Sequence, residues 1–124
     1  MPGPQAAAAD CTVYGIRNCD TMKRARAWLD AHSKCYAFHD YQLVGIEPAR
    51  LAAWCRQLGW QRLLNRAGTT FRKLDPAARE DLDQERAIAL MLAQPSMIKR
   101  PVLQRGDALL LGFDPAAYVQ FFRE

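Results

Sequence analysis

Residues 12–29, TVYGIRNCDTMKRARAWL, change from a strand pattern to a helix pattern at a cysteine, Cys19. Residues 12–16 are β-branched or aromatic around a glycine, which is typical of a short buried strand. From Asp20 onward apolar residues recur at helical spacing, and basic residues take the other positions. Asp20 and Thr21 are residue types that accept hydrogen bonds from first-turn amides. We therefore expect the helix to begin within a residue or two of Cys19.

A cysteine at the start of a helix is a candidate nucleophile. First-turn amides and the helix dipole favour the thiolate over the thiol, and the thiolate is the reactive form. Arg17 and Lys23 supply positive charge nearby, whereas the neighbouring Asp20 acts in the opposite direction. A buried, inert cysteine is the alternative, and it is common for this residue type. The residues alone leave both interpretations open.

The motif Asn18-Cys19-Asp20-Thr21, placed after a strand and before a basic helix, resembles the arsenate reductase (ArsC)-related family. The resemblance extends over residues 11–122 and includes LLNRAGTTFRKL at 63–74 and MIKRPVL at 97–103. Within the family it points to the YffB-like branch, with the Spx regulators as cousins. It implies an α/β protein with a thioredoxin-like fold, a mixed sheet and a helical insertion.

Composition limits the class of protein. A chain of 124 residues with 50% hydrophobic content is large enough for one compact domain with its own core. We expect a disordered tail at residues 1–10, MPGPQAAAAD, and a single domain over 11–124 that carries the helical insertion at about 47–95. The formal charge of +4 favours an anionic ligand or partner.

The sequence argues against several partners and locations. The 17 basic and 13 acidic residues form no polybasic tail, so we expect no direct nucleic-acid binding. Residues 1–10 lack the basic start and long apolar run typical of a secretory signal, and no segment approaches the roughly 20 apolar residues of a membrane span. We therefore predict a cytoplasmic protein without membrane contact. Four cysteines without metal-type clustering predict reduced thiols and no structural metal.

The remaining pattern predicts the elements in thioredoxin order. Residues 35–41 should form a second strand parallel to the first. Pro48 should open a helix that Gly59 ends, and residues 63–72 should form a loop. Asp75-Pro76 should open one long helix that Pro95 stops. A hairpin of strands 102–104 and 109–111 and a final helix after Asp114-Pro115 should follow, with four residues of that helix packed on the sheet: Ala116, Tyr118, Val119 and Phe122.

Two arginines outside the first motif are candidate site residues. Arg66 lies among hydroxyls, glycine and a second guanidinium, a composition typical of an anion pocket and also of surface loops. The resemblance favours a substrate-binding role for Arg66, with Lys23 and Asn18 beside the cysteine. Arg100 precedes Pro101 at the start of a strand, where proline needs an edge position or special geometry such as a cis bond.

The resemblance places Arg100 beside Cys19 and Pro101 in the substrate site. A guanidinium there would lower the thiol pKa and hold an anionic substrate through two parallel hydrogen bonds. Cys19 and Arg100 are therefore the predicted catalytic residues. A simple ion pair of Arg100 with an acidic side chain is the alternative.

Differences between this chain and the family pattern indicate which activity to expect. Redox-switching Spx regulators carry two cysteines separated by two residues. In this chain Met22 stands where the second of these cysteines would be, so no local disulfide forms. Cys19 must work as a single thiol that an outside thiol resolves. Glutathione is the expected co-substrate, with a glutaredoxin as a further partner. The sequence thus predicts a glutathione-dependent monothiol reductase.

Two other functions remain open. Arsenate reductases of this fold carry a further arginine that residues 111–113 lack, and they have glycine where Asp20 stands, so the resemblance implies weak arsenate reduction at most. An Spx-like, non-enzymatic regulator that binds RNA polymerase is the alternative from a different class, because the fold alone would suffice for docking.

Overall fold

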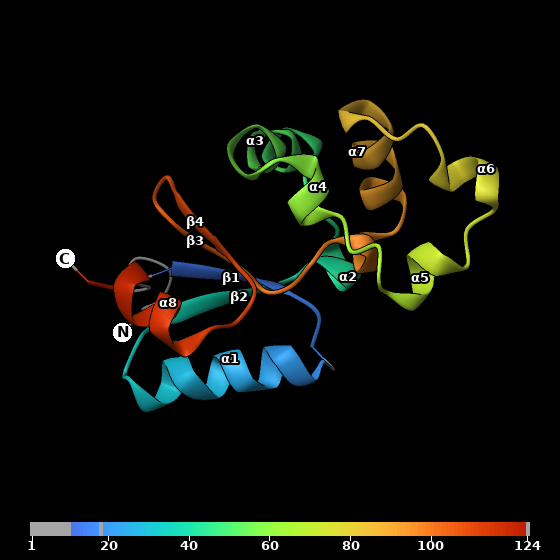
Figure 1. Ribbon diagram of the computed structural model, residues 1–124. Helices are drawn as coiled ribbons and strands as arrows, with labels where there is room; N and C mark the ends of the chain where they lie inside the picture. The colour runs from blue at the N-terminus through green and yellow to red at the C-terminus, as the bar shows by residue number, and fades with distance from the viewer. Residues whose placement is uncertain (1–10, 18, 124) are drawn as a thin grey trace. The chain divides into compact units, whose positions relative to one another are not determined.

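The computed structural model describes residues 11–17 and 19–123, which form two compact units (Figure 1). The first unit contains the described residues up to 40 together with those from 100 onward, and the second contains residues 41–99. The tail expected at residues 1–10 lies outside the described residues, and the single domain with an insertion at about 47–95 stays a prediction. None of the described helices has the length and apolar character that crossing a bilayer requires.

The first unit is built on a mixed, four-stranded sheet. Its strands are β1 (Cys11–Gly15), β2 (Tyr36–Asp40), β3 (Val102–Arg105) and β4 (Ala108–Leu111). They lie in the order β2-β1-β3-β4, with β1 parallel to β2 and antiparallel to β3, and β4 antiparallel to β3. The predicted strand–helix–strand unit and the hairpin are both present, and the thioredoxin-like fold is confirmed.

Helices α1 (Asp20–Ala31) and α8 (Pro115–Phe121) pack on one face of this sheet (Figure 1). The shared core contains buried side chains from both helices and both central strands: Val13, Met22, Ala25, Leu29, Leu103, Tyr118 and Phe122. The sequence also placed Val119 in this core. That prediction is wrong for Val119, which is 45% exposed, and the same prediction is wrong for Ala116, which is also exposed. Tyr118 and Phe122 carry the packing at this end of the chain.

The second unit is helical. Its elements are α2 (Tyr41–Val44), α3 (Pro48–Leu58), α4 (Trp60–Leu63), α5 (Thr69–Arg72), α6 (Pro76–Arg79), α7 (Gln84–Ala93) and the 3₁₀ turn η2 (Pro95–Met97). An antiparallel bridge joins Leu64, in the middle of the unit, to Ile98 near its end. The Tyr41 hydroxyl donates a buried hydrogen bond of 2.8 Å to the Ile98 carbonyl. This unit therefore brings together the segments LLN and MIK of the sequence motifs.

Two predictions for the second unit need correction, and one short helix was missed. Helix α3 begins at Pro48 and ends before Gly59 as expected, but α2 was not predicted. Residues 63–72 are not all loop, because α4 ends at Leu63 and Thr69–Arg72 forms α5. The long helix expected from Asp75 is broken into α6 and α7.

Backbone conformation and a second cap explain the break in the long helix. Asp81 has a left-handed backbone with φ of 53°, which interrupts a helix, and Glu80 is extended. The Asp83 carboxylate then accepts a 2.8 Å hydrogen bond from the Arg86 N–H and starts α7 as its N-cap.

Replacement of Asp83 by alanine should lower the free energy of unfolding by about 1 kcal/mol, because the cap of α7 is lost. Asp75→Ala is the matched control, since Asp75 occupies the N-cap position of α6 but makes no side-chain cap bond. Urea unfolding of the two variants measures the difference. Equal stability of both variants would contradict the assignment of Asp83 as the cap.

Candidate active site

Cys19 occupies the N-cap position of α1. Its backbone is extended, with φ of −145° and ψ of 132°, and its carbonyl accepts a 2.9 Å hydrogen bond from the Lys23 N–H. The helix therefore begins where the sequence predicts. Asp20 and Thr21 are its first two helical residues rather than its cap. The half-buried Cys19 side chain lies at the positive end of a helix of 12 residues.

Sheet register brings Arg100 to the same place. Strands β1 and β3 are antiparallel and Tyr14 pairs with Val102, so the residues just before β3 lie beyond the end of β1, where the loop to Cys19 begins. Pro101 is buried, its carbonyl accepts a 2.8 Å hydrogen bond from the Gly112 N–H, and the Arg100–Pro101 bond is cis. The half-buried Arg100 side chain donates a hydrogen bond to the Cys19 sulfur.

The surroundings of Cys19 lower its pKa. Burial alone would raise the pKa of this thiol, because a thiolate loses hydration there. The N–H of Met22, the Arg100 side chain and the N–H of Thr21 act in the opposite direction, and together they bring the pKa below its ordinary value. The site therefore stabilises the thiolate through first-turn amides and one guanidinium.

The other predicted site residues are placed as follows. Lys23 is exposed on α1, one turn after Cys19. Asn18 lies outside the described residues. Arg66 belongs to the second unit, where its exposed guanidinium stacks over the Trp60 ring at 5.3 Å. The substrate-binding roles of Lys23, Asn18, Arg66 and Pro101 stay predictions.

The remaining cysteines differ from Cys19. Cys11 and Cys55 are buried, and burial raises the pKa of the Cys55 thiol. Cys35 is exposed immediately before β2. In the described part of the chain, no group of three or more histidine, cysteine or acidic side chains could hold a metal ion.

A contact between Gly15 and Met22 supports the cysteine loop, and sequence reasoning missed it. Met22 is fully buried, and a Cβ atom added to Gly15 would lie 2.3 Å from its Sδ and 2.7 Å from its Cε. Gly15, at the end of β1, therefore makes room for the side chain of Met22, the residue whose backbone N–H faces the Cys19 thiol. A glycine inside an apolar strand pattern was the available signal for this close approach.

Replacement of Gly15 by alanine should lower the free energy of unfolding by about 1–3 kcal/mol, because the new methyl group overpacks against Met22. Chemical denaturation of Gly15→Ala, Met22→Ala and the double variant forms a double-mutant cycle. The double variant should be less destabilised than the sum of the two single variants. Strict additivity would show that the two residues do not compete for space.

The fold and the site together define a class: thioredoxin-like proteins with a single cysteine at the N-terminus of the first helix. Comparison with known proteins narrows this class. The model of the ArsC family matches residues 14–121, and the chain belongs to that family.

Solved structures and curated relatives agree with this assignment. The chain is similar to the solved structure of a YffB protein, with 61% identity, a TM-score of 0.86, and coverage of 89% of this chain and 96% of the other. It is also similar to an arsenate reductase (ArsC) related protein from Brucella melitensis, with 49% identity, a TM-score of 0.74 and full coverage of both chains. A more distant relative is the global transcriptional regulator Spx of Streptococcus mutans, 23% identical over 106 residues, which are 83% of this chain and 76% of the relative.

Proposed function

We propose that the protein is a glutathione-dependent monothiol reductase with Cys19 as its nucleophile. The observation that carries this proposal is the lowered pKa of the Cys19 thiol beside Arg100 at the start of α1. A thiolate is the attacking species in disulfide exchange, so a lowered pKa increases the fraction of Cys19 that can react at neutral pH. The position of a local second thiol is taken by Met22, which is fully buried. The resolving thiol must therefore come from outside.

The proposed reaction has two exchange steps. The Cys19 thiolate attacks the glutathione sulfur of a mixed disulfide between glutathione and a substrate, a bond forms between the two sulfurs, and the substrate leaves as its thiolate. A second glutathione then attacks the sulfur of the bound glutathione, which releases glutathione disulfide and regenerates the Cys19 thiolate. The net change is reduction of one glutathione–substrate mixed disulfide by one glutathione molecule, which yields the substrate thiol and glutathione disulfide, with protons exchanged with solvent.

Charged residues near the thiol suit this co-substrate. Glutathione carries two carboxylates, and guanidinium groups bind carboxylates through charge-assisted hydrogen bonds. In the proposal Arg100 both stabilises the thiolate and binds a carboxylate, and the exposed Lys23 supplies a second positive charge one helical turn away.

The test is turnover with a glutathionylated model disulfide, in which glutathione disulfide formation is coupled to NADPH oxidation by glutathione reductase. The proposal expects steady turnover that depends on both glutathione and the protein. Adding arsenate in place of the disulfide tests arsenate reduction, which should be much slower. Absence of turnover above the uncatalysed exchange with the disulfide would overturn the proposal.

The similarity to Spx favours a second candidate, a regulator that docks to RNA polymerase without turnover. The two candidates make opposite predictions for Cys19→Ser. The reductase loses turnover in this variant, whereas a docking protein keeps its binding to purified polymerase and shows no turnover in either form.

A further inference from the structure

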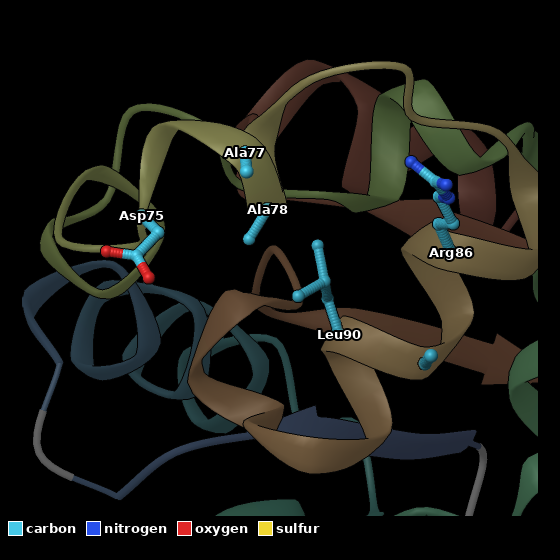
Figure 2. Close-up of a pocket in the computed structure, with 6 residues that line it drawn as sticks. Asp75, Ala77, Ala78, Arg86 and Leu90 are labelled. Atoms are coloured by element: carbon cyan, nitrogen blue, oxygen red, sulfur yellow. The ribbon is translucent and has the colours of Figure 1, made fainter.

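Two features of the described residues lie outside the proposed active site. One is an open hollow of about 550 Å³ between α6 and α7 (Figure 2). Its two charged residues, Asp75 and Arg86, each have an exposed neighbour of the opposite sign, Lys73 and Glu85, so the hollow does not select one kind of partner. The other feature is the edge strand β4, whose backbone specifies a partner more closely.

Strand β4 forms one edge of the sheet, because the strands lie in the order β2-β1-β3-β4. Its residues are Ala108, Leu109, Leu110 and Leu111. Leu110 packs against the core of the first unit, and Leu109 and Leu111 lie on the other face of the sheet, because side chains alternate along a strand. Edge strands commonly contain a charge, a proline or a bulge that prevents pairing with another chain. Strand β4 contains no charge and no proline, and its register with β3 is continuous.

The hairpin register shows which backbone groups of β4 point away from β3. The Gly112 N–H donates a 2.8 Å hydrogen bond to the Pro101 carbonyl, so the backbone groups of Gly112 face the β3 side. Alternate residues of an antiparallel pair face the partner strand, so Leu110 also faces β3, whereas the N–H and C=O groups of Leu109 and Leu111 point outward. Within the described part of the chain, no hydrogen bond is made to these outward groups.

We propose that β4 pairs antiparallel with β4 of a second copy of the chain, so that one sheet continues through both subunits. A twofold axis beside Leu110 places Leu109 opposite Leu111 of the partner subunit, and Leu111 opposite Leu109 of the partner subunit. Each of these pairs exchanges both of its N–H···O=C bonds, which satisfies all the outward groups. The strand is therefore its own complement, and the dimer is closed because each subunit offers this edge once.

The charges around β4 do not oppose this pairing. The nearest charged residues on the same elements are Arg105, Asp107 and Asp114. The Arg105 guanidinium donates a 3.0 Å hydrogen bond to the Phe121 carbonyl of its own chain. Asp107 lies in the turn before the paired residues, and Gly112, with φ of 87°, turns the chain out of the line of β4 before Asp114. The paired stretch thus brings only leucines together.

Association can be measured by sedimentation velocity of the full chain from about 1 μM to about 1 mM, with a reductant that prevents disulfide-linked dimers through the exposed Cys35. A reversible equilibrium of monomer and dimer is expected, and it is weak because the paired strand is short. Leu109→Pro removes an outward N–H without breaking a bond to β3, and it should weaken association at least about tenfold. Leu109→Ala is the matched control, because it loses the same side chain but keeps the N–H, and it should dimerise more tightly than Leu109→Pro.

Amide hydrogen exchange locates the interface. In the monomer the N–H groups of Leu109 and Leu111 should exchange fast, whereas the Leu110 N–H, which bonds to β3, should be protected in every variant and shows that the hairpin is intact. Once about nine-tenths of the chains are dimeric, exchange at Leu109 and Leu111 should slow about tenfold, because it proceeds through the remaining monomer.

Four results would each overturn the proposal. They are absence of a dimer over this concentration range, equal association of the two Leu109 variants, assemblies larger than a dimer, and slow exchange of the Leu109 and Leu111 N–H groups at every concentration. The last result would mean that the edge is covered within one chain.

Discussion

Replacement of Cys19 by serine is expected to abolish glutathione-dependent turnover, with a fall of at least about a thousandfold, because a hydroxyl is a far weaker nucleophile than a thiolate at neutral pH. Nothing in the packing opposes the change, since the side chain is half-buried and oxygen is smaller than sulfur. The measurement is the coupled turnover assay at saturating glutathione.

Cys35→Ser is the matched control for this loss. Cys35 is exposed, but it lies immediately before β2 and not at the start of a helix. The turnover of Cys35→Ser should therefore equal that of the unmodified protein. Loss of turnover in Cys35→Ser with turnover retained in Cys19→Ser would identify Cys35 as the nucleophile and would contradict the site as described.

Replacement of Arg100 by alanine should reduce turnover at neutral pH by at least about tenfold, because a lost charged hydrogen bond costs roughly 1.5–3 kcal/mol and the thiol pKa rises as well. Burial remains in the variant, and burial raises the pKa of the Cys19 thiol. Removal of the guanidinium takes away both a hydrogen bond and a positive charge that lower it. The thiolate fraction at neutral pH therefore falls.

The sign of this effect can be checked by a pH profile. The rate of Cys19 modification follows the thiolate fraction, so the midpoint of its pH profile should move to higher pH in Arg100→Ala. Arg24→Ala, which removes an exposed cation of α1, is the control and should leave the midpoint almost unchanged. An unchanged midpoint in Arg100→Ala would exclude its role as the activator.

Local signals in the sequence were sufficient for the first unit. The β-branched and aromatic residues before Cys19, the hairpin pattern of residues 102–104 and 109–111 and the helical spacing after Asp20 predicted three strands and α1, because each of these elements is also favoured by its own residues. The prediction for Val119 failed because, at 3.6 residues per turn, this residue points about 100° away from Tyr118, which shares the buried face with Phe122.

Prediction was weaker for the second unit. Apolar residues on both sides of residues 80–83 fit one continuous helix, but the cap that Asp83 provides and the left-handed backbone of Asp81 divide it. The short helices α2 and α5 lack the length at which periodicity becomes informative.

The site was predicted in part. A cysteine at a helix start can be recognised from neighbouring residues, but its contact with Arg100 depends on strand register far along the chain, and only the family resemblance anticipated it. The fit of Met22 against Gly15 depends on three-dimensional packing that no residue pattern specifies.

The activation of Cys19 is tested most directly by the intact mass of the protein after incubation with glutathione disulfide over a range of pH. We expect a single glutathione adduct on Cys19, formed with a midpoint below the pKa of about 8.5 of an unperturbed cysteine. An unmodified Cys19 while Cys35 reacts, or a Cys19 midpoint at or above that of an unperturbed cysteine, would contradict the assignment of Cys19 as an activated nucleophile.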